Sequence, residues 1–574
     1  MGDISSPPSN TFDFIVVGAG PAGILAATCL ANSRKHPSVL LVEAGGENGA
    51  LEARIDANRW LHRMIPDSNW KYMTEPQQSL NNRLIEYDRG KGLGGGSSIN
   101  FACWTVPPKD DFDEIARRTG NPEWEWSQAQ VRFKRIESYH ADPSQLPDGA
   151  SKYLRPLETD HGKDGPIKIG FPVIWEKSVT TEYDAWVAAG YEANPDHNSG
   201  NPLGVSIIAS TAFRGERSTA ADALVHAPGN LHILTDAEVA RVNFNGKTAT
   251  GITTIGGRDY YATKEVILSA GTLDTPRILM HSGIGPAAQL TKFNIPVLYD
   301  NPAIGQHMKD HHHAILSYLG APHTSIRREY FQSKEAQEAA MKQWQTNRTG
   351  PLAEIACTLG IVYAKIPSIY TSSEFANLSA NIQNYLSQPT VPSFEVIFNA
   401  TTVMFDMDPN SKPAKNAFVF LLNEQSEGCV LLQSTDPATP LKFDPKFLSH
   451  PFDKRVVIEA TREVLRVANS PEYAKDTIGE LNTPKSTSDE DILEFWRENT
   501  ASTWHMTGTV RMGQEGQEGG SGVDKDFKVH GVGHLRVADM SVVPLLVNAH
   551  TQTVAYLTGL MAGDTIVKEY GLDE

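Results

Sequence analysis

A glycine-rich turn at residues 18–23 constrains the fold of this chain more than any other segment. It reads Gly-Ala-Gly-Pro-Ala-Gly and follows a run of β-branched and aromatic residues at 12–17. Residues 24–33 are apolar and are predicted to form a helix, and residues 39–42 are predicted to form a second buried strand that ends at Glu43. Strand, tight turn, helix and strand make a βαβ unit, which requires parallel strands joined by a crossover helix.

The glycines of this turn suit a dinucleotide. Gly18 permits the tight turn, Gly20 lets a pyrophosphate approach the backbone, and Gly23 lets helix and strand pack closely. The N-terminus of the predicted helix then faces the anion. Glu43 lies 23 residues after Gly20, where a carboxylate accepts hydrogen bonds from a ribose diol and repels a 2′-phosphate. We therefore expect NAD or FAD rather than NADP, and the motif does not separate the first two.

A second glycine-rich segment, residues 89–100, reads Arg-Gly-Lys-Gly-Leu-Gly-Gly-Gly-Ser-Ser-Ile-Asn. Its backbone N–H groups, two hydroxyls and two cations indicate a cradle for an anion. The alternative is a flexible surface loop. The apolar continuation at residues 101–104 favours a buried segment and therefore the cradle.

Charge and hydropathy exclude several classes of protein. The 574 residues are 40% hydrophobic and 21% charged, as in folded globular chains of two to four domains. Lys and Arg number 51 against 68 Asp and Glu, and the net charge of −17 has the wrong sign for a nucleic-acid partner. No uninterrupted apolar run reaches the roughly 18 residues of a membrane span, so none is expected.

The cysteines and the first residues indicate where the chain works. Four cysteines lie far apart without a C-x-x-C pair, which argues against a disulfide framework and a zinc site. The polar start has neither a basic region nor an apolar region of a secretion signal, and the end is not a peroxisomal address. We expect a cytoplasmic protein.

The remaining sequence predicts a discontinuous nucleotide-binding domain and a second domain. Residues 265–271 and 535–539 read as further buried strands, each followed by helical sequence, at 273–281 and 553–570. The middle of the chain alternates short strand-like runs with Pro and Asp turns, which predicts an antiparallel sheet with helices. The expected division is a nucleotide-binding domain of residues 1–165, 205–315 and 505–574, and a substrate-binding domain of residues 166–204 and 316–504.

Five segments together resemble the glucose-methanol-choline (GMC) family of FAD-dependent oxidoreductases, and the nearest likeness is to fungal alcohol, aryl-alcohol and formate oxidases. These segments are residues 18–23 with Glu43, 89–100, 269–285, 505–513, and 535–544 with the final helix. The resemblance implies FAD as cofactor. It also implies an α/β fold with a Rossmann-like FAD-binding domain and a substrate-binding domain whose antiparallel sheet is flanked by helices.

The resemblance implies a set of FAD-contacting residues. Pro21 and Ala22 would cover the pyrophosphate, and Val239 would meet the adenine edge through its backbone. Ile99 stands where some family members carry the histidine that attaches FAD covalently, so the cofactor is expected to be noncovalent. The complete expected set is Gly18, Gly20, Pro21, Ala22, Gly23, Glu43, Arg89, Gly96, Asn100, Phe101, Cys103, Val239, Ala270, Trp504, Asp539, Thr551 and Gln552.

The resemblance also implies a catalytic pair, His505 and His550. Oxidation of a carbinol requires removal of the hydroxyl proton as hydride leaves for the flavin, and a neutral imidazole with an ordinary pKa near 6.5 suits this role. His505 is expected to be the base. His550 is expected to hydrogen-bond the substrate oxygen, at a position where many family members carry Asn and formate-oxidase-like members carry Arg.

Other histidines and apolar residues are weaker candidates. The run His311-His312-His313 could suggest a metal, but adjacent side chains rarely converge, so a structural role is expected. The substrate pocket is expected to draw on the 316–504 region. Phe398, Met404, Phe405 and Met407 are its candidate walls, and a place in the hydrophobic core is an equal alternative for them.

The predicted function is FAD-dependent oxidation of a small-molecule primary alcohol, or of an aldehyde hydrate, with the flavin reoxidised by O2 or another acceptor. Three alternatives stay open at this point. They are formate-oxidase-like oxidation of a small acid, a hydroxynitrile lyase with redox-silent FAD, and a flavin-binding protein without catalysis. The presence of both His505 and His550 counts against the last of these.

Overall fold

The computed structural model describes residues 9–142, 146–325, 333–354, 359–398, 413–517 and 519–574. It confirms the βαβ unit, in which β1 (Thr11–Val17) leads into α1 (Pro21–Ala31) and then into β2 (Val39–Val42). Helix α1 begins three residues earlier than the apolar pattern predicts. Proline at the first helical position explains this start, because its fixed φ and missing N–H are tolerated there.

The first sheet joins segments from across the chain. Its strand order is β12-β2-β1-β15-β14-β13, with β26 paired to β15. The pairs β12–β2, β2–β1, β1–β15 and β15–β26 are parallel, whereas β13, β14 and β15 run antiparallel. The strands beyond the βαβ unit are β12 (Leu231–Leu234), β13 (Val239–Asn245), β14 (Thr248–Thr254), β15 (Asp259–Leu268) and β26 (Leu535–Val537).

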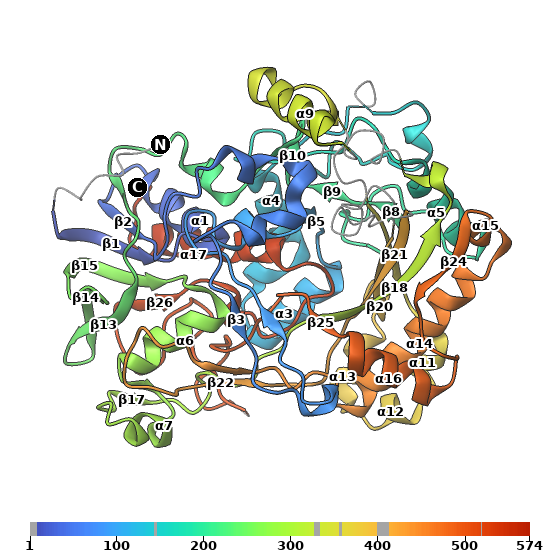
Figure 1. Ribbon diagram of the computed structural model, residues 1–574. Coiled ribbons are helices and arrows are strands. Elements are labelled where there is room, and N and C mark those ends of the chain that lie inside the picture. The colour runs from blue at the N-terminus through green and yellow to red at the C-terminus, as the bar shows by residue number, and fades with distance from the viewer. Residues whose placement is uncertain (1–8, 143–145, 326–332, 355–358, 399–412, 518) are drawn as a thin grey trace.

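The last helix returns to the first one. Helix α17 (Gln552–Glu569) packs against α1, and Figure 1 shows both beside the first sheet, close to the two chain termini. Glycines make this approach possible. A Cβ at Gly559 would collide with the carbonyl of Ala22, and one at Gly563 would lie 2.7 Å from Cβ of Cys29. The first sheet and its helices are therefore discontinuous in sequence, as predicted.

The second sheet is antiparallel and lies on the opposite side of the molecule in Figure 1. Helices α14 (Pro451–Ala468) and α16 (Asp489–Asn499) pack against it and lie at its lower right in Figure 1. Its strands, in spatial order, are β24 (Thr477–Asn482), β18 (His312–Gly320), β21 (Ala414–Leu421), β20 (Phe394–Phe398), β19 (Gly360–Ala364) and β8 (Gly204–Ile207), with β25 (Ala501–Ser502) paired to β18.

Two strands of the second sheet reach into the range 205–315 that the sequence predicts for the nucleotide-binding domain. Strand β8 begins at Gly204 and pairs with β19, and β18 begins at His312 and pairs with β21. These residues belong to the second sheet because strand pairing, and not composition, determines which sheet a segment joins. The division of the chain into two domains stays a prediction.

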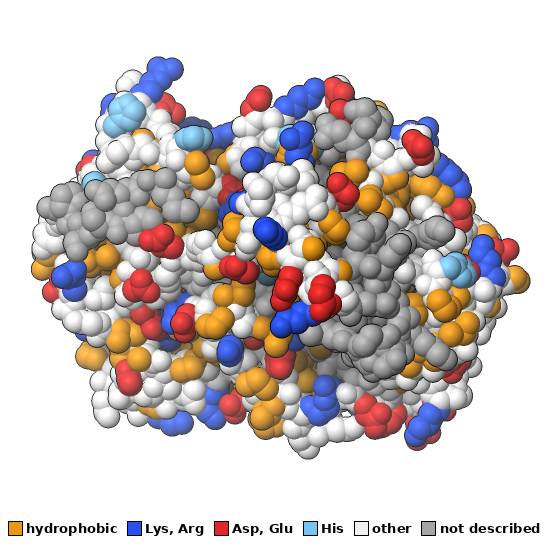
Figure 2. All heavy atoms as spheres, turned by 45° about the horizontal axis from the view of Figure 1, so that its top comes forward, with side chains coloured by type: hydrophobic (Ala, Val, Ile, Leu, Met, Phe, Trp, Pro, Cys, Tyr) orange, Lys and Arg blue, Asp and Glu red, His pale blue; other side chains and the backbone are white. Residues whose placement is uncertain are grey.

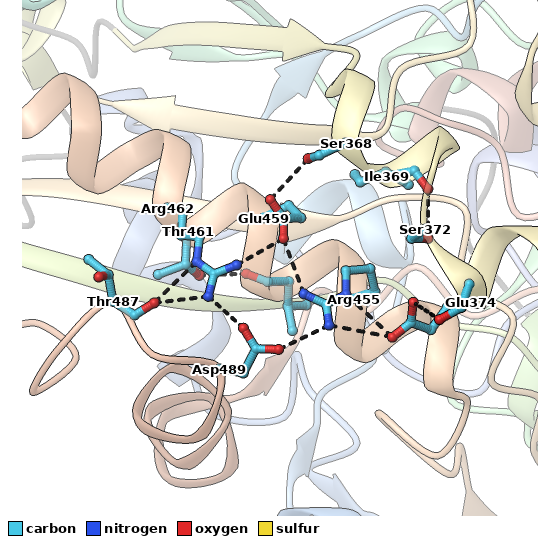
Figure 3. A network of polar contacts seen from close by, with 12 residues as sticks. Ser368, Ile369, Ser372, Glu374, Arg455, Glu459, Thr461, Arg462, Thr487 and Asp489 are labelled. Atoms are coloured by element: carbon cyan, nitrogen blue, oxygen red, sulfur yellow. Dashed lines mark hydrogen bonds and ion pairs between the residues drawn. The ribbon is translucent and has the colours of Figure 1, made fainter.

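A network of charged side chains joins the helices that pack next to the second sheet (Figure 3). Arg455 on α14 contacts Glu374, Glu459 and Asp489, and Arg462 contacts Glu459 and Asp489. These side chains are partly exposed, so each pair contributes at most about 1 kcal/mol. Since they join α14, α16 and the short helix α12 (Ser373–Ala376), their effect is to fix the positions of these helices.

The surface carries both signs of charge. On the face in Figure 2, acidic and basic side chains of the described residues are interspersed and do not gather by sign. Among the helices that the structure describes, none is long and apolar enough to cross a membrane.

Candidate active site

The two glycine-rich segments meet where the parallel strands end. The N–H of Gly94 donates to the carbonyl of Ala19 at 2.8 Å. A Cβ at Gly95 would lie only 2.8 Å from Cα of Gly20, and Gly95 itself has a φ of +50°. Only glycine suits such a contact, so the turn at 18–23 and the segment at 89–100 form one continuous backbone cradle.

Glu43 joins the two segments through its carboxylate. Its oxygens accept hydrogen bonds from the N–H groups of Ala19 at 2.7 Å, Gly45 at 3.0 Å and Gly92 at 2.9 Å. Burial raises the pKa of Glu43, and these N–H donors oppose the rise. The sequence predicts a ribose ligand for Glu43, which stays a prediction. The structure adds a role in holding the cradle together that local sequence does not reveal.

A first cavity opens on this cradle. Ten predicted cofactor residues line it: Gly18, Gly20, Pro21, Ala22, Glu43, Arg89, Gly96, Val239, Ala270 and Asp539. Gly23 does not line it, because this residue instead lets α1 pack against the carbonyl of Gly18.

The shape and polarity of this cradle fit a pyrophosphate. A Cβ built on Gly20 would meet no atom within 4 Å, so the backbone there is open to a ligand. Helix α1 has no side-chain cap and no acidic residue in its first turn. Its first N–H groups and its dipole therefore favour an anion at this end.

Asp539 closes the far wall of the first cavity. Its carboxylate accepts from the N–H of Gly271 at 2.9 Å, the hydroxyl of Thr275 at 2.6 Å and the N–H of Ser541 at 2.8 Å. These bonds join the end of β26 to the N-terminus of α6 (Gly271–His281). Burial raises the pKa of Asp539 against the effect of these donors.

A second cavity adjoins the first and contains the histidines. Pro21, Arg89 and Gly96 line both. The predicted residues on its wall are Pro21, Arg89, Gly96, Asn100, Phe101, Cys103, Trp504, His505, His550, Thr551 and Gln552. Together the two cavities therefore contain every predicted site residue except Gly23.

The apolar wall of the second cavity differs from the predicted one. Leu359, Ile397, Phe418 and Phe420 line it, from β19, β20, β21 and their approaches. Phe398 is buried in the core and is not on this wall, because neighbouring residues of β20 point to opposite faces of the sheet. Met404, Phe405 and Met407 lie outside the described residues.

Behind the cradle, Arg217 fixes the orientation of Asn100. Its guanidinium donates to the side-chain oxygen of Asn100 at 2.8 Å and also to the backbone oxygen of that residue. The Asn100 amide in turn donates to Oε1 of Gln552. Nε2 of Gln552 is buried and has no partner among the described residues, so it offers a hydrogen-bond donor to a bound group. Sequence reasoning missed Arg217, which carries no motif.

The backbone before His505 is held in a strained conformation. Trp504 has a φ of +61°, in the left-handed region that a bulky residue rarely adopts. Arg89 donates to the Trp504 carbonyl at 2.7 Å, and the N–H of Trp504 donates to the Ser502 hydroxyl at 2.8 Å. The N–H of His505 donates to Asp310 at 2.7 Å. These bonds fix the direction in which the His505 ring leaves the backbone.

His505 and His550 lie side by side in the second cavity. Their ring centroids are 4.8 Å apart. Burial lowers the pKa of His505 well below its ordinary value, and nearby positive charge from His550, His311 and Arg89 adds to the effect. His505 is therefore neutral near pH 7 and able to accept a proton.

Each of these histidines has a polar partner that sequence reasoning missed. Nε2 of His550 lies 2.8 Å from Oε1 of Glu395, which is buried on β20. Nδ1 of His505 lies 3.0 Å from Nδ1 of His311. Glu395 carries no local signal, because its position follows from the pairing of β20 with β21.

Two residues of the run 311–313 lie next to the catalytic candidates, and the structural role expected for this run stays a prediction. His311 contacts His505, and His313 lines the second cavity with Nδ1 3.3 Å from the Thr503 hydroxyl. His312 lies between them in sequence and contacts neither His505 nor the second cavity, because successive side chains of a strand point to opposite faces. This alternation was the available signal. Within the described residues, no group of three or more His, Cys, Asp or Glu side chains is arranged to hold a metal ion.

Comparisons with known proteins identify the family of this chain. Sequence profiles of GMC oxidoreductases match residues 12–313 and 424–559. A pyranose dehydrogenase from Agaricus campestris is 29% identical over 98% of this chain and 95% of its own length. A formate oxidase variant from Aspergillus oryzae, studied for FAD modification, has a TM-score of 0.88 at 26% identity and covers 99% of this chain and 100% of its own.

A fungal aryl-alcohol oxidase shares the fold, with a TM-score of 0.85 at 23% identity over 98% of this chain and 100% of its own. The two matching profiles extend over most of the sequence, from the βαβ unit to the final helix. The chain therefore belongs to the GMC family of FAD-dependent oxidoreductases.

Proposed function

We propose that this protein oxidises a primary alcohol, or the hydrate of an aldehyde, whose body is apolar or aromatic. The observation that carries the proposal is the pair His505 and His550, with ring centroids 4.8 Å apart, in a cavity walled by Phe101, Phe418 and Phe420. A carbinol that lies against both rings meets a nitrogen atom of each, while its carbon chain meets apolar side chains.

His505 is the base. Its Nδ1 is bonded to His311, so Nε2 is the nitrogen that accepts the hydroxyl proton. A neutral ring is required for this step, and the lowered pKa of His505 keeps the ring neutral.

His550 positions the substrate oxygen. Its Nε2 is bonded to Glu395, which leaves Nδ1 for the substrate. The carboxylate balances the charge of a doubly protonated ring, and such a ring donates a hydrogen bond that strengthens as the oxygen becomes negative.

The cofactor is FAD, held without a covalent bond. Bound FAD supplies the two-electron acceptor of the oxidation. The backbone cradle of residues 18–23 and 89–100 would hold its pyrophosphate, and Asn100 with Gln552 would hydrogen-bond the ring system. Ile99 is aliphatic and forms no covalent link. O2 or another acceptor then reoxidises the enzyme.

The comparisons favour two competing substrates. Likeness to formate oxidase favours a small acid. However, a carboxylate is best held by a fixed cation, and this chain carries His550 where formate-oxidase-like members carry Arg. Similarity to pyranose dehydrogenase favours a sugar. A sugar requires several polar partners, whereas the side of the cavity formed by Leu359, Ile397, Phe418 and Phe420 is apolar.

The test is anaerobic mixing of the holoenzyme with a benzylic alcohol, a linear alcohol, formate and a pyranose, followed by flavin absorbance. We expect bleaching by the two alcohols and little by the others. Faster bleaching by formate or the sugar would contradict the substrate class. Cyanide release from a cyanohydrin without bleaching would instead support a lyase, and no response to any compound would support a flavin-binding protein.

A further inference from the structure

Behind the base lies a buried chain of ionisable groups that leads away from the substrate. Nδ1 of His311 contacts Nδ1 of His505 at 3.0 Å, and Nε2 of His311 faces Oε2 of Glu424 at 3.6 Å. Oε1 of Glu424 faces Nδ1 of His312 at 3.7 Å. The side chains of His311, His312 and Glu424 are each at most 2% exposed.

These groups are incompletely paired. Nε2 of His311, both ring nitrogens of His312 and both carboxylate oxygens of Glu424 are buried without a hydrogen-bond partner among the described residues. A buried polar group without a partner destabilises the fold. A stable core would place apolar residues here. Because His311 contacts the base, the arrangement suggests that His311 and Glu424 have a role that needs groups able to take and release a proton, whereas His312 faces the other oxygen of Glu424 and is outside this role.

The backbone around Glu424 is rigidly held. Asp453 on α14 accepts from the N–H groups of Gln425 at 2.8 Å and Ser426 at 2.7 Å, and Lys309 donates to the Glu424 carbonyl at 2.7 Å. Burial, together with the charges of Asp453 and Asp310, raises the pKa of Glu424, whereas Lys309 lowers it.

Because His505 and His311 are in contact, the nitrogen that carries the proton on one ring determines which nitrogen carries it on the other. When Nε2 of His505 is free, its proton is on Nδ1, and Nδ1 of His311 must be the acceptor. The proton of His311 is then on Nε2, which faces Glu424. An ionised Glu424 stabilises this arrangement. A protonated Glu424 favours the reverse one, in which Nε2 of His505 carries a proton and cannot act as a base.

We propose that Glu424, acting through His311, keeps Nε2 of His505 free and receives the proton that the substrate releases. The proposal rests on the function proposed above, in which His505 is the base. Glu424 and His311 are positioning and proton-transfer residues that do not touch the substrate.

Three proton transfers make up the relay. The substrate O–H bond breaks as a proton bonds to Nε2 of His505. The Nδ1–H bond of His505 breaks as its proton bonds to Nδ1 of His311, and the Nε2–H bond of His311 breaks as its proton bonds to Oε2 of Glu424. The last transfer follows a closer approach of the two groups, since 3.6 Å exceeds a hydrogen bond. The two electrons leave with the carbinol hydride and do not pass along this chain.

The first test compares His311→Phe with the matched control His312→Phe in the holoenzyme. Both replace a buried ring that lies near Glu424, but only His311 contacts His505. We expect His311→Phe and the isosteric Glu424→Gln to slow anaerobic flavin reduction by about 100-fold, the lower end of what a general base contributes. The control should stay within about threefold of the wild type, and FAD content should be unchanged in all.

The second test measures how the rate of flavin reduction depends on pH. A merely structural role of Glu424 would not produce such a dependence. The limiting rate of flavin reduction in the wild type should fall as pH decreases through the raised pKa of Glu424. Glu424→Gln has no such ionisation and should lose this inflection. The pH profile of Glu424→Gln also decides the matter if His311→Phe prevents FAD binding.

The outcomes separate this proposal from the function on which it rests. If His505→Ala reduces FAD as fast as the wild type, His505 is not the base and both fail. If His505→Ala is slow while Glu424→Gln keeps both the wild-type rate and the inflection, the relay is overturned and the proposed function stands.

Discussion

The cofactor cradle and the histidine cavity adjoin each other but are built in different ways. The cradle consists mainly of backbone groups from two glycine-rich turns, and Glu43 holds them together. The cavity consists of side chains from residues near 100, 311, 395, 420, 505 and 550. The difference teaches that a backbone site is defined locally in the sequence, whereas a side-chain site depends on how distant segments pair.

The two regions are expected to have separate functions, FAD binding in the cradle and flavin reduction in the cavity. Changes in the cradle should remove FAD, and changes in the cavity should leave FAD bound but slow its reduction. Variants in each region test that division.

The largest effect is expected for Gly23→Val. A Cβ at this position would collide with the carbonyl of Gly18, so α1 could not pack against β1. Overpacking against backbone has no rotamer that relieves it. We expect little soluble protein and no bound FAD, measured by absorbance after purification. Gly229→Val is the control, because a Cβ at Gly229 would meet no atom within 4 Å, its φ lies outside the left-handed region and it lies next to β12 of the first sheet. FAD at wild-type content in Gly23→Val would contradict the cradle.

Glu43→Gln should weaken FAD retention without changing the rate of reduction of the FAD that remains. An amide keeps one acceptor oxygen but loses the charge that orders the N–H groups of Ala19, Gly45 and Gly92. Hydrogen bonds to a charged group contribute about 1.5–3 kcal/mol each, so Kd for FAD should rise at least about tenfold. Equilibrium dialysis measures it. An unchanged Kd for FAD together with slow flavin reduction would contradict this prediction, because Glu43 would then act in the chemistry and not in FAD binding.

A buried triad outside both regions tests stability alone. His161 lies between Glu137 and Asp196, at 3.1 Å from each, and burial opposes the effect of these carboxylates, which raise its pKa to about 9. The unfolded pKa is near 6.5, so the stabilisation is complete below that pH and is lost as pH rises through about 9. We expect Tm to fall between pH 7 and 9.5, and His161→Gln to flatten that fall. An equally steep fall in the variant would contradict the triad's role.

The smallest effect is expected for Glu395→Gln. His550 keeps a hydrogen-bond partner but loses the charge that balances a doubly protonated ring. Flavin reduction by an alcohol should slow by about tenfold, with FAD content unchanged. Stopped-flow absorbance measures the rate, and Glu374→Gln, on the distant surface network of Figure 3, is the control. A wild-type rate would mean that His550 acts without Glu395.

The sequence predicts most of the cradle and only part of the cavity. The βαβ unit depends on neighbouring residues, and β1, α1 and β2 agree with prediction to within a few residues. His505 and His550 were found through family resemblance, not through spacing. Their partner Glu395 could not be predicted, since only the pairing of β20 in the second sheet brings it to His550. His311 and His313 could have been found from the alternation of a strand.

The central claim is that His505 performs the chemistry but is not needed to hold FAD in the site. The most direct test measures FAD content and the anaerobic rate of flavin reduction in His505→Ala, with His530→Ala as a control outside both cavities. The account predicts about one FAD per chain, released by acid, and a rate about 100-fold to 10,000-fold below the wild type. Reduction at the wild-type rate, or loss of FAD from His505→Ala alone, would contradict it.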